Sequence, residues 1–240
     1  MSLLSEIGRF SSQTALIGSD GVELSYTTLV REAARVARVM KPRELVFLHC
    51  ANNIESVVFY LGILNANAIP ILLDDGIPLT SLTALIDCYQ PSYAVVSSAL
   101  TYAVQGKELL AAGDRVLIAV ESQRDYEISD ELAQLMTTSG STGSPKFVRQ
   151  TEENLRTNSS AIRDYLEITP GDRAITTLPM SYSYGLSIIN SHLISGASIV
   201  MNQASVTQKD FWKLLNVSGA NNFGGVPYLF DVLGRMKVLK

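Results

Sequence analysis

Short apolar runs alternate with longer segments whose apolar residues recur at helical spacing along most of this chain. Residues 45–49 and 69–73 are apolar runs of strand length, and residues 53–66 between them carry apolar side chains at helical positions. A strand, a helix and a second strand within about 30 residues make a right-handed crossover between parallel strands. Because the pattern repeats, the sequence predicts an α/β fold with a mainly parallel sheet, or sheets, flanked by helices on both faces.

The same two periodicities predict the remaining elements. A hairpin is expected at residues 14–25, followed by a helix capped near Thr27 or Thr28, and a polar loop is expected at residues 121–131. Further strands are predicted at residues 93–97, 115–120, 132–137, 147–148, 173–178, 197–201 and 221–226. Further helices are predicted at residues 80–89, at 101–112 with Gly113 as the stop, after a Thr151 cap, at 184–194, after a capping-box pattern at Thr207–Asp210, and at 228–236.

Composition excludes several classes of protein. The chain has 240 residues, a formal net charge of −4 and 18% charged residues, so no nucleic-acid or membrane partner is expected. Residues 1–6 lack the basic start and apolar run of a signal peptide, no run reaches the length of a membrane span, and a cytoplasmic location is expected. Cys50 and Cys88 have no metal or redox spacing and are predicted to be buried free thiols; His49 and His192 are predicted core or surface histidines.

Residues 135–148 carry the strongest chemical signal. Two apolar residues lead into eight consecutive Ser, Thr and Gly residues, and the run closes on Pro145 and Lys146. Gly140 and Gly143 allow close approach to the backbone, hydroxyl and N–H groups donate to anionic oxygens, and the lysine adds a positive charge. The pattern is typical of a phosphate cradle. A solvated Ser/Gly connector is the alternative.

Two details favour the cradle over the connector. The run lies directly between two predicted strands, and Lys146 follows a proline whose φ is restricted. It is not a Walker loop, because Pro145, Lys146 and Phe147 replace the Gly-Lys-Ser/Thr ending. It is not a dinucleotide-binding fingerprint either, because the proline disfavours a helix that begins at the second glycine.

Thr138–Lys146 resembles the phosphate loop of the adenylate-forming superfamily, which contains the acyl-CoA synthetases, the peptide-synthetase adenylation domains and the luciferases. The segments at residues 24–29 and 61–70 also resemble motifs of this family. The chain departs from the family pattern at Phe147, which replaces a usual Gly, and at Glu152, which replaces the His of Thr-His-x-Asn-Leu.

Two later stretches resemble the family in the expected order. Residues 178–186 match the family's Pro-Leu-x-His-x-x-Gly with Tyr182 in the His position, and residues 224–229 match Val-Pro-x-x-Leu. Ligands of open α/β sheets gather at the carboxyl ends of strands, where both stretches are predicted to lie. The alternatives are ordinary aromatic packing and a simple tight turn. The predicted substrate-binding residues are Tyr182, Tyr184, Gly185 and Gly225.

The resemblance implies an ATP-dependent ligase that activates a carboxylic acid as an acyl-adenylate and passes the acyl group to a thiol, either CoA or a carrier-protein phosphopantetheine. It implies ATP as cosubstrate and Mg²⁺ bridging the phosphates, although no carboxylate of the chain is an evident ligand for the ion. Lys146 is the expected catalytic residue, because it offsets charge as pyrophosphate leaves. The implied nucleotide-binding residues are Thr138, Ser139, Gly140, Ser141, Thr142, Gly143 and Lys146.

The later family motifs have no counterpart in the sequence. There is no Tyr-Gly-x-Thr-Glu, no Thr-Gly-Asp turn and no lid domain with an adenylation lysine. Residues 1–240 are therefore predicted to be the N-terminal α/β domain of such an enzyme. A stand-alone, non-catalytic nucleotide-binding or scaffold protein derived from the same fold is the alternative.

Overall fold

The computed structural model describes residues 3–121, 124, 126–137 and 147–236. Its strands are β1 (Thr14–Ile17), β2 (Glu23–Ser25), β3 (Leu45–Cys50), β4 (Ile69–Asp74), β5 (Tyr93–Ser97), β6 (Gly106–Ala112), β7 (Arg115–Val120), β8 (Leu132–Thr137), β9 (Phe147–Thr151), β10 (Arg173–Ile175) and β11 (Ser198–Val200). Its helices are α1 (Leu3–Ile7), α2 (Tyr26–Ala37), α3 (Ile54–Asn65), α4 (Leu79–Tyr89), α5 (Glu152–Leu166), α6 (Ser183–Ile194), α7 (Lys209–Ser218) and α8 (Pro227–Arg235), with short 3₁₀ helices at Gly8–Phe10 and Ser98–Ala103.

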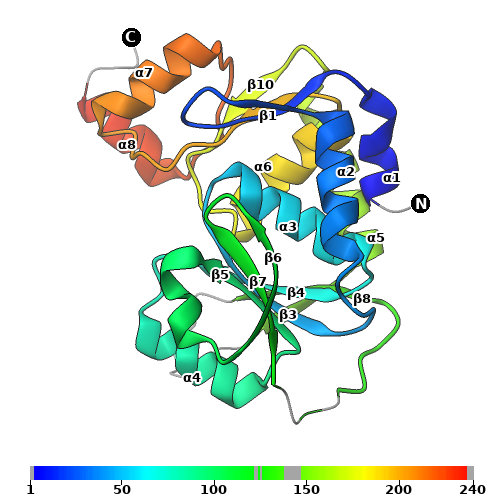
Figure 1. Ribbon diagram of the computed structural model, residues 1–240. Coiled ribbons are helices and arrows are strands. Elements are labelled where there is room, and N and C mark those ends of the chain that lie inside the picture. Colours follow the sequence, from blue (N-terminus) through cyan, green and yellow to red (C-terminus); the bar gives the residue numbers. More distant parts are fainter. Residues whose placement is uncertain (1–2, 122–123, 125, 138–146, 237–240) are drawn as a thin grey trace.

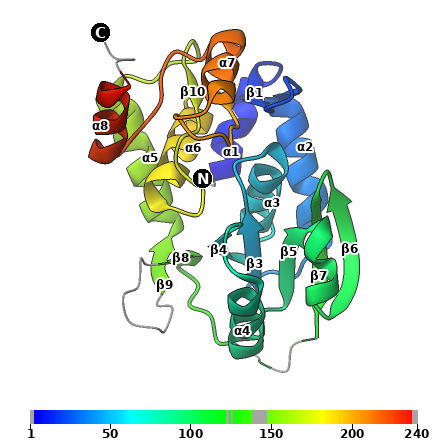
Figure 2. The same cartoon turned by 90° about the vertical axis from the view of Figure 1, so that its left-hand side faces the viewer.

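The strands form two sheets separated by a layer of helices (Figure 1). One sheet has the order β6-β7-β5-β3-β4-β8-β9 and the other the order β10-β11-β1-β2. One apolar core lies between the sheets, a second joins the larger sheet to α4, and a third joins the smaller sheet to α7 and α8. The predicted α/β class is confirmed, as two sheets in a layered arrangement (Figure 2).

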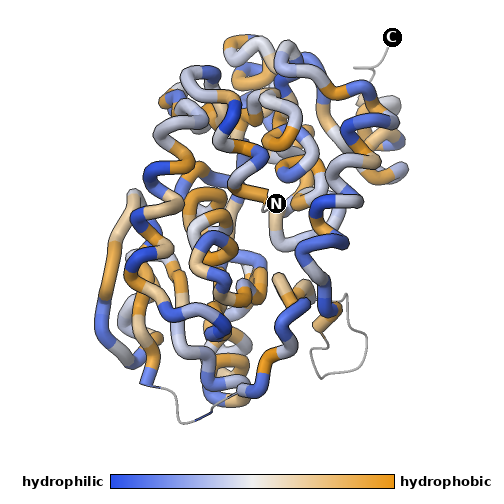
Figure 3. Tube along the Cα trace, turned by 90° about the vertical axis from the view of Figure 1, so that its right-hand side faces the viewer, coloured by the Kyte–Doolittle hydropathy of each residue, from blue (hydrophilic) through white to orange (hydrophobic). Residues whose placement is uncertain are grey.

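The middle layer explains why two helices are apolar on nearly every side. Eight consecutive residues of α3, from Ser56 to Ile63, are buried, and α6 is buried almost throughout between Gly185 and Ile194. A helix that packs between two sheets has no face toward water, so it loses the amphipathic pattern of a surface helix. In Figure 3, hydrophobic and hydrophilic stretches alternate along the chain trace.

Parallel pairing holds the centre of each sheet. β3 pairs in parallel with β4 and β5, β4 pairs in parallel with β8, and β11 pairs in parallel with β1 and β10. Three of the four edges are antiparallel: β2 pairs with β1, β9 pairs with β8, and the β6–β7 hairpin pairs with β5 through β7. The fourth edge strand, β10, pairs in parallel with β11. The prediction of mainly parallel pairing is therefore confirmed for the sheet centres and for β10, and the other three edges depart from it.

The helix predicted at residues 101–112 is wrong. Residues 98–103 form a 3₁₀ helix, and residues 106–112 form β6, which pairs with β7. Gly113 has φ of +53° and links the two strands together with Asp114, a two-residue Gly-Asp turn typical of a hairpin. This glycine therefore turns a hairpin and does not stop a helix. Leu109 and Leu110 pack on the central core from the strand.

Four smaller expectations also change. Residues 221–226 make a single bridge to β10 at Asn222 and no strand, and the strand predicted to reach residue 178 ends at Ile175. The α7 helix begins after Gln208 without a side-chain cap, so the capping box expected at Thr207 does not form. Cys88 is exposed, because α4 buries only the opposite stripe of its surface, whereas Cys50 is a buried free thiol as predicted.

Candidate functional site

The predicted phosphate-loop residues lie between the paired ends of two strands. β8 ends at Thr137, opposite the first residue of β9, Phe147. Residues Thr138, Ser139, Gly140, Ser141, Thr142, Gly143 and Lys146 lie outside the described residues, so their assignment stays a prediction. The register of β4 with β8 pairs Leu72 with Met136. The carboxyl ends of β4 and β8 therefore lie side by side.

The segment between β10 and α6 is fastened across this edge of the larger sheet. Asn52, just after β3, donates from Nδ2 to the Leu178 carbonyl at 3.0 Å and accepts from the Met180 N–H at 3.0 Å. Ser181 donates from Oγ to Oδ2 of Asp74 at 2.8 Å. Since Asp74 is the last residue of β4, these bonds place the segment at the ends of β3 and β4, beside the strand that leads into the predicted phosphate loop.

The two predicted tyrosines follow this anchored segment. Tyr182 and Tyr184 are 49% and 39% exposed, so ordinary core packing does not account for either of them. The Tyr184 hydroxyl lies against Gly224, where an added Cβ would come within 3.1 Å of that oxygen. Thr177 donates from Oγ1 to the Gly224 carbonyl, which joins the two predicted substrate stretches. The structure thus brings these two stretches together.

Gly185 has a structural role beside its predicted binding role. A Cβ at this position would lie 2.1 Å from the Pro179 carbonyl oxygen and 2.9 Å from that of Leu178. Only glycine lets the first turn of α6 pack against the preceding segment. Gly225 is less crowded, since a Cβ there would meet Leu229 and Phe230 at 3.0 and 3.1 Å.

A cavity of about 480 Å³ opens at the carboxyl ends of β10 and β11. Asn202 stabilises its wall, with its N–H donating to Thr176 Oγ1 at 2.8 Å and its Nδ2 donating to the Thr176 carbonyl at 3.1 Å. The described lining residues carry no charged side chain. They are Asn52, Thr176, Thr177, Pro179, Asn202, Gln203, Ala204, Ser205, Val206, Thr207, Val226, Tyr228, Leu229 and Val232. We define this as the carboxyl-edge cavity.

Sequence reasoning missed Asn52, Asp74 and Asn202. All three are polar residues at or just after the end of an apolar strand, in β3, β4 and β11. Polar residues in that position are a usable signal, because the carboxyl ends of parallel strands line ligand sites in α/β folds. Pro179 and Tyr228, which belong to the two predicted substrate stretches, also line the cavity. The predicted residues Tyr182, Tyr184, Gly185 and Gly225 do not.

Titratable groups beneath this edge do not supply acid–base or thiol chemistry. Burial, together with the charge of Arg115, lowers the pKa of His49, so the imidazole is neutral at pH 7. Arg115 is buried, donates to the His49 carbonyl at 3.1 Å and approaches Asp75 at 3.8 Å. Burial raises the pKa of the Cys50 thiol, which therefore stays protonated and is a poor nucleophile.

The described residues form no cluster of magnesium ligands. In residues 3–121, 124, 126–137 and 147–236, no three His, Cys, Asp or Glu side chains gather in a way that could hold a metal ion. Magnesium prefers carboxylates and phosphate oxygens, so these residues provide no preformed set of ligands for it. Among the same residues, no helix is long and apolar enough to span a bilayer.

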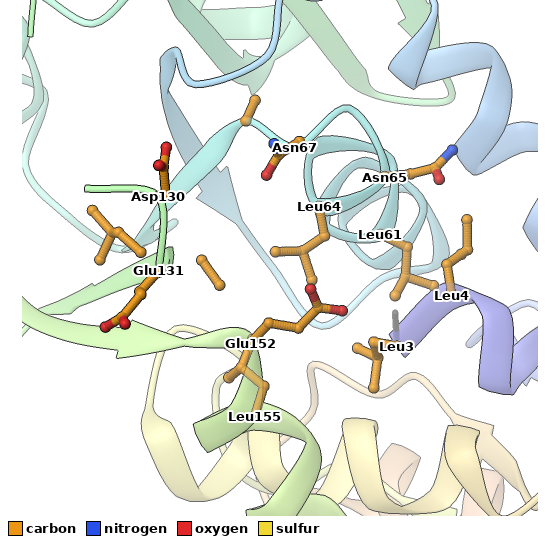
Figure 4. Close-up of a pocket in the computed structure, with 13 residues that line it drawn as sticks. Leu3, Leu4, Leu61, Leu64, Asn65, Asn67, Asp130, Glu131, Glu152 and Leu155 are labelled. Atoms are coloured by element: carbon orange, nitrogen blue, oxygen red, sulfur yellow. The ribbon is translucent and has the colours of Figure 1, made fainter. Parts of the chain in front are cut away.

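A second cavity, of about 340 Å³, lies at the opposite edge of the larger sheet, where β4 and β8 begin (Figure 4). Glu152, Asp130 and Glu131 contribute carboxylates to its described lining, and no basic side chain belongs to it. The other lining residues are Leu3, Leu4, Leu61, Leu64, Asn65, Asn67, Ala68, Leu132, Ala133 and Leu155. None of the predicted site residues is among them. We define this as the amino-edge cavity.

Known proteins resemble this chain in sequence and in fold. Tyrocidine synthase 3 of Brevibacillus parabrevis is 27% identical over 248 residues, which cover 95% of this chain and 4% of the synthase. The structure of ATP-bound MatB from Rhodopseudomonas palustris matches with a TM-score of 0.78 and 24% identity, over 97% of this chain and 51% of MatB. The o-succinylbenzoate CoA synthetase of Bacillus subtilis, solved with an acyl-adenylate intermediate, matches with a TM-score of 0.77 and 22% identity, over 97% and 63%.

These likenesses carry different weight. At such identities the solved structures establish the fold alone, and this chain spans 4% of the synthase and 51% and 63% of the two crystallised proteins. The family model described as AMP-binding enzyme matches residues 5–240, nearly the whole chain. The resemblance first drawn from Thr138–Lys146 is confirmed at the level of the family. The chain belongs to the AMP-binding enzyme family.

Proposed function

We propose that this chain is the N-terminal α/β domain, residues 1–240, of an ATP-dependent ligase that activates a carboxylic acid. The acid's carboxylate oxygen attacks the α-phosphorus of ATP, the bond from that phosphorus to the bridging oxygen breaks, and pyrophosphate leaves with the electron pair. A thiol, from CoA or a carrier-protein phosphopantetheine, then attacks the acyl carbon, and AMP leaves as the new thioester forms. Membership of the AMP-binding family supports this reaction class.

The single observation that carries the proposal is the meeting of two signals at one sheet edge. The Ser/Thr/Gly run begins where β8 ends, next to β4, and Asp74 of β4 holds the segment that leads to Tyr182. In this proposal the Ser/Thr/Gly run binds the phosphates and the other predicted stretches bind the acid, so that the two halves of the reaction are separated. The phosphates would be held by hydroxyl and N–H donors of residues 138–143, and the acid would lie toward Tyr182 and Tyr184.

Lys146 has the catalytic role in this proposal. Its charge would offset the negative charge that develops as pyrophosphate departs, which is electrostatic stabilisation rather than proton transfer. Magnesium would enter with the nucleotide, bound chiefly by phosphate oxygens, since the described residues offer it no cluster of ligands.

The test is carboxylate-dependent exchange of labelled pyrophosphate into ATP, run on the full-length gene product with a panel of aliphatic, aromatic and amino acids. Exchange with at least one acid, slowed by roughly 30-fold or more in Lys146→Ala, supports the ligase. ATP binding without exchange for any acid contradicts it and favours the non-catalytic nucleotide-binding alternative. The isolated 240 residues are expected to exchange slowly, well below the roughly 1 to 10³ per second of ordinary enzymes, because the family's Thr-Gly-Asp turn and lid lysine are absent from them.

A further inference from the structure

Four polar side chains form a hydrogen-bonded chain through the apolar core between the two sheets. Asn190 of α6 donates from Nδ2 to the Tyr60 hydroxyl of α3 at 3.2 Å. Tyr60 donates to Oε1 of Gln134 in β8 at 3.0 Å, and Gln134 donates from Nε2 to Oε1 of Gln150 in β9 at 2.5 Å. Gln134 and Gln150 are also direct cross-strand partners. We call these four residues the core network.

Burying these polar side chains would destabilise the fold if their hydrogen bonds were not made. Tyr60 and Gln134 have no exposed surface and Asn190 is 3% exposed. Burial raises the pKa of Tyr60, so its hydroxyl stays neutral and keeps its proton to donate. Apolar side chains of similar shape could replace these four residues with little loss of stability. Buried polar side chains, by contrast, must keep the one geometry in which their hydrogen bonds are made. Its evident contribution is therefore to position the elements it joins.

One polar atom of the network is left over, and a cavity lies beside it. Asn190 Oδ1 is buried and has no hydrogen-bond partner among the described residues. Asn190 lines a cavity of about 30 Å³, large enough for one water molecule. The described walls are mostly amides and hydroxyls: Gln134, Gln150, Asn154, Asn158, Ser159, Ser183, Ser187 and Asn190, with Leu155 and Leu186. An ordered water there would donate to Oδ1 and extend the network to α5.

The elements joined by the network are those that carry the candidate site. α6 begins at Ser183, two residues after the serine that bonds Asp74, and β8 and β9 are the strands on either side of the predicted phosphate loop. We propose that the core network is a positioning device that locks α6 to β8 and β9, so that nucleotide binding at the β8–β9 end also orders the start of α6 on the acid side. The ligand named here rests on the proposed function.

The test compares two tyrosine hydroxyls by hydrogen–deuterium exchange. Tyr60→Phe removes the centre of the network. Tyr26→Phe is the matched control, because the Tyr26 hydroxyl is equally buried and bonds the last turn of α6 at the Leu193 carbonyl, and the Ala197 carbonyl beyond it, without touching the network. Both variants are measured in the full-length protein without ligand and with saturating ATP and magnesium.

Without ligand, Tyr60→Phe is expected to speed exchange in residues 183–190 and in β8 by more than Tyr26→Phe does. With ATP, wild type and Tyr26→Phe are expected to gain protection both in residues 132–137 and 147–151 and in residues 183–190. Tyr60→Phe should still gain protection in residues 132–137 and 147–151 but should gain none in residues 183–190. Asn190→Leu, which cuts only the link to α6, should reproduce this loss if Tyr60→Phe proves too unstable.

Two results overturn the proposal. The positioning role is excluded if, without ligand, residues 183–190 exchange at the same rate in Tyr60→Phe as in the control Tyr26→Phe. The coupling is excluded if ATP still protects residues 183–190 as fully as residues 132–137 and 147–151 in Tyr60→Phe or in Asn190→Leu. If ATP protects no part of wild type, the proposed function fails, and the ligand-free comparison still decides whether the network positions α6.

Discussion

Two cavities of similar size and opposite character lie at strand ends, one at the carboxyl ends of β10 and β11 and the other where β4 and β8 begin. The carboxyl-edge cavity measures about 480 Å³ and its described lining holds no charged side chain, whereas the amino-edge cavity measures about 340 Å³ and is lined by three carboxylates and several leucines. An acidic lining repels nucleotide phosphates and carboxylic acids alike. The difference teaches that volume does not identify the site here. Strand direction and charge do, and both favour the carboxyl edge.

The strongest way to break this comparison is to add one methyl group at the carboxyl edge. Gly185→Ala should lower the free energy of unfolding by about 3 kcal/mol or more, because the new Cβ would meet backbone oxygen at 2.1 Å, which flexible side-chain motion cannot relieve. Gly234→Ala in α8 is the control, since no atom lies within 4 Å of its added Cβ, and it should gain about 0.5–1 kcal/mol. Urea unfolding of both variants measures this; equal stabilities would mean that the turn at Pro179 is not rigid.

The second test compares the effect on catalysis of removing the charge of Lys146 with the effect of removing the charge of Glu152, which lines the amino-edge cavity. Lys146→Ala should slow pyrophosphate exchange by about 2–4 kcal/mol in activation free energy, roughly 30- to 900-fold, with little change in melting temperature. Glu152→Gln removes a carboxylate from the amino-edge cavity and should leave the rate within about twofold, because the residue lies at the other end of β8. A larger loss in Glu152→Gln than in Lys146→Ala would move the site to the amino edge.

An amide at each edge offers a milder contrast. Asn52→Ala should cost about 1–3 kcal/mol of stability, because it leaves the Leu178 carbonyl and the Met180 N–H without their partner. It should also raise KM for the acid, as the segment before Tyr182 loosens. Asn65→Ala, at an exposed position of the amino-edge cavity, should stay within about 0.5 kcal/mol. Thermal melts and saturation kinetics on the pair check this, and an unchanged KM in Asn52→Ala would contradict the anchoring role.

Acid should weaken the carboxyl edge through His49. Burial and Arg115 lower its pKa in the folded state, while the nearby Asp74 and Asp75 oppose the shift. The unfolded chain therefore takes up a proton before the folded one does, and stability contributed by neutral His49 is lost as pH falls below about 6.5. The expected slope from this group is at most about 1.4 kcal/mol per pH unit. His49→Gln should flatten the pH dependence of unfolding below pH 6.5 and leave it unchanged at pH 8; an unaltered slope would show that His49 titrates normally.

Several elements were predictable from the chain because the signal is local. Buried parallel strands such as β3 and β4 are continuous apolar runs whatever covers them. The start of α5 was predictable too, since Thr151 and Asn154 cap each other's backbone within four residues. Residues 106–112 were not, because their leucines fit a helix as well as a strand until β7 pairs with them.

The site divides in the same way. The sequence alone pointed to the Ser/Thr/Gly run, the paired tyrosines and Gly185, because each pattern lies within a few consecutive residues. Only the tertiary structure decided that Asn52 holds a carbonyl 126 positions away, and that Tyr60 bonds to a glutamine 74 positions away. Periodicity records which face of an element is buried and carries no record of its partner. That choice is made by packing two sheets around α3 and α6, where each buried polar group must find a donor or acceptor from another part of the chain.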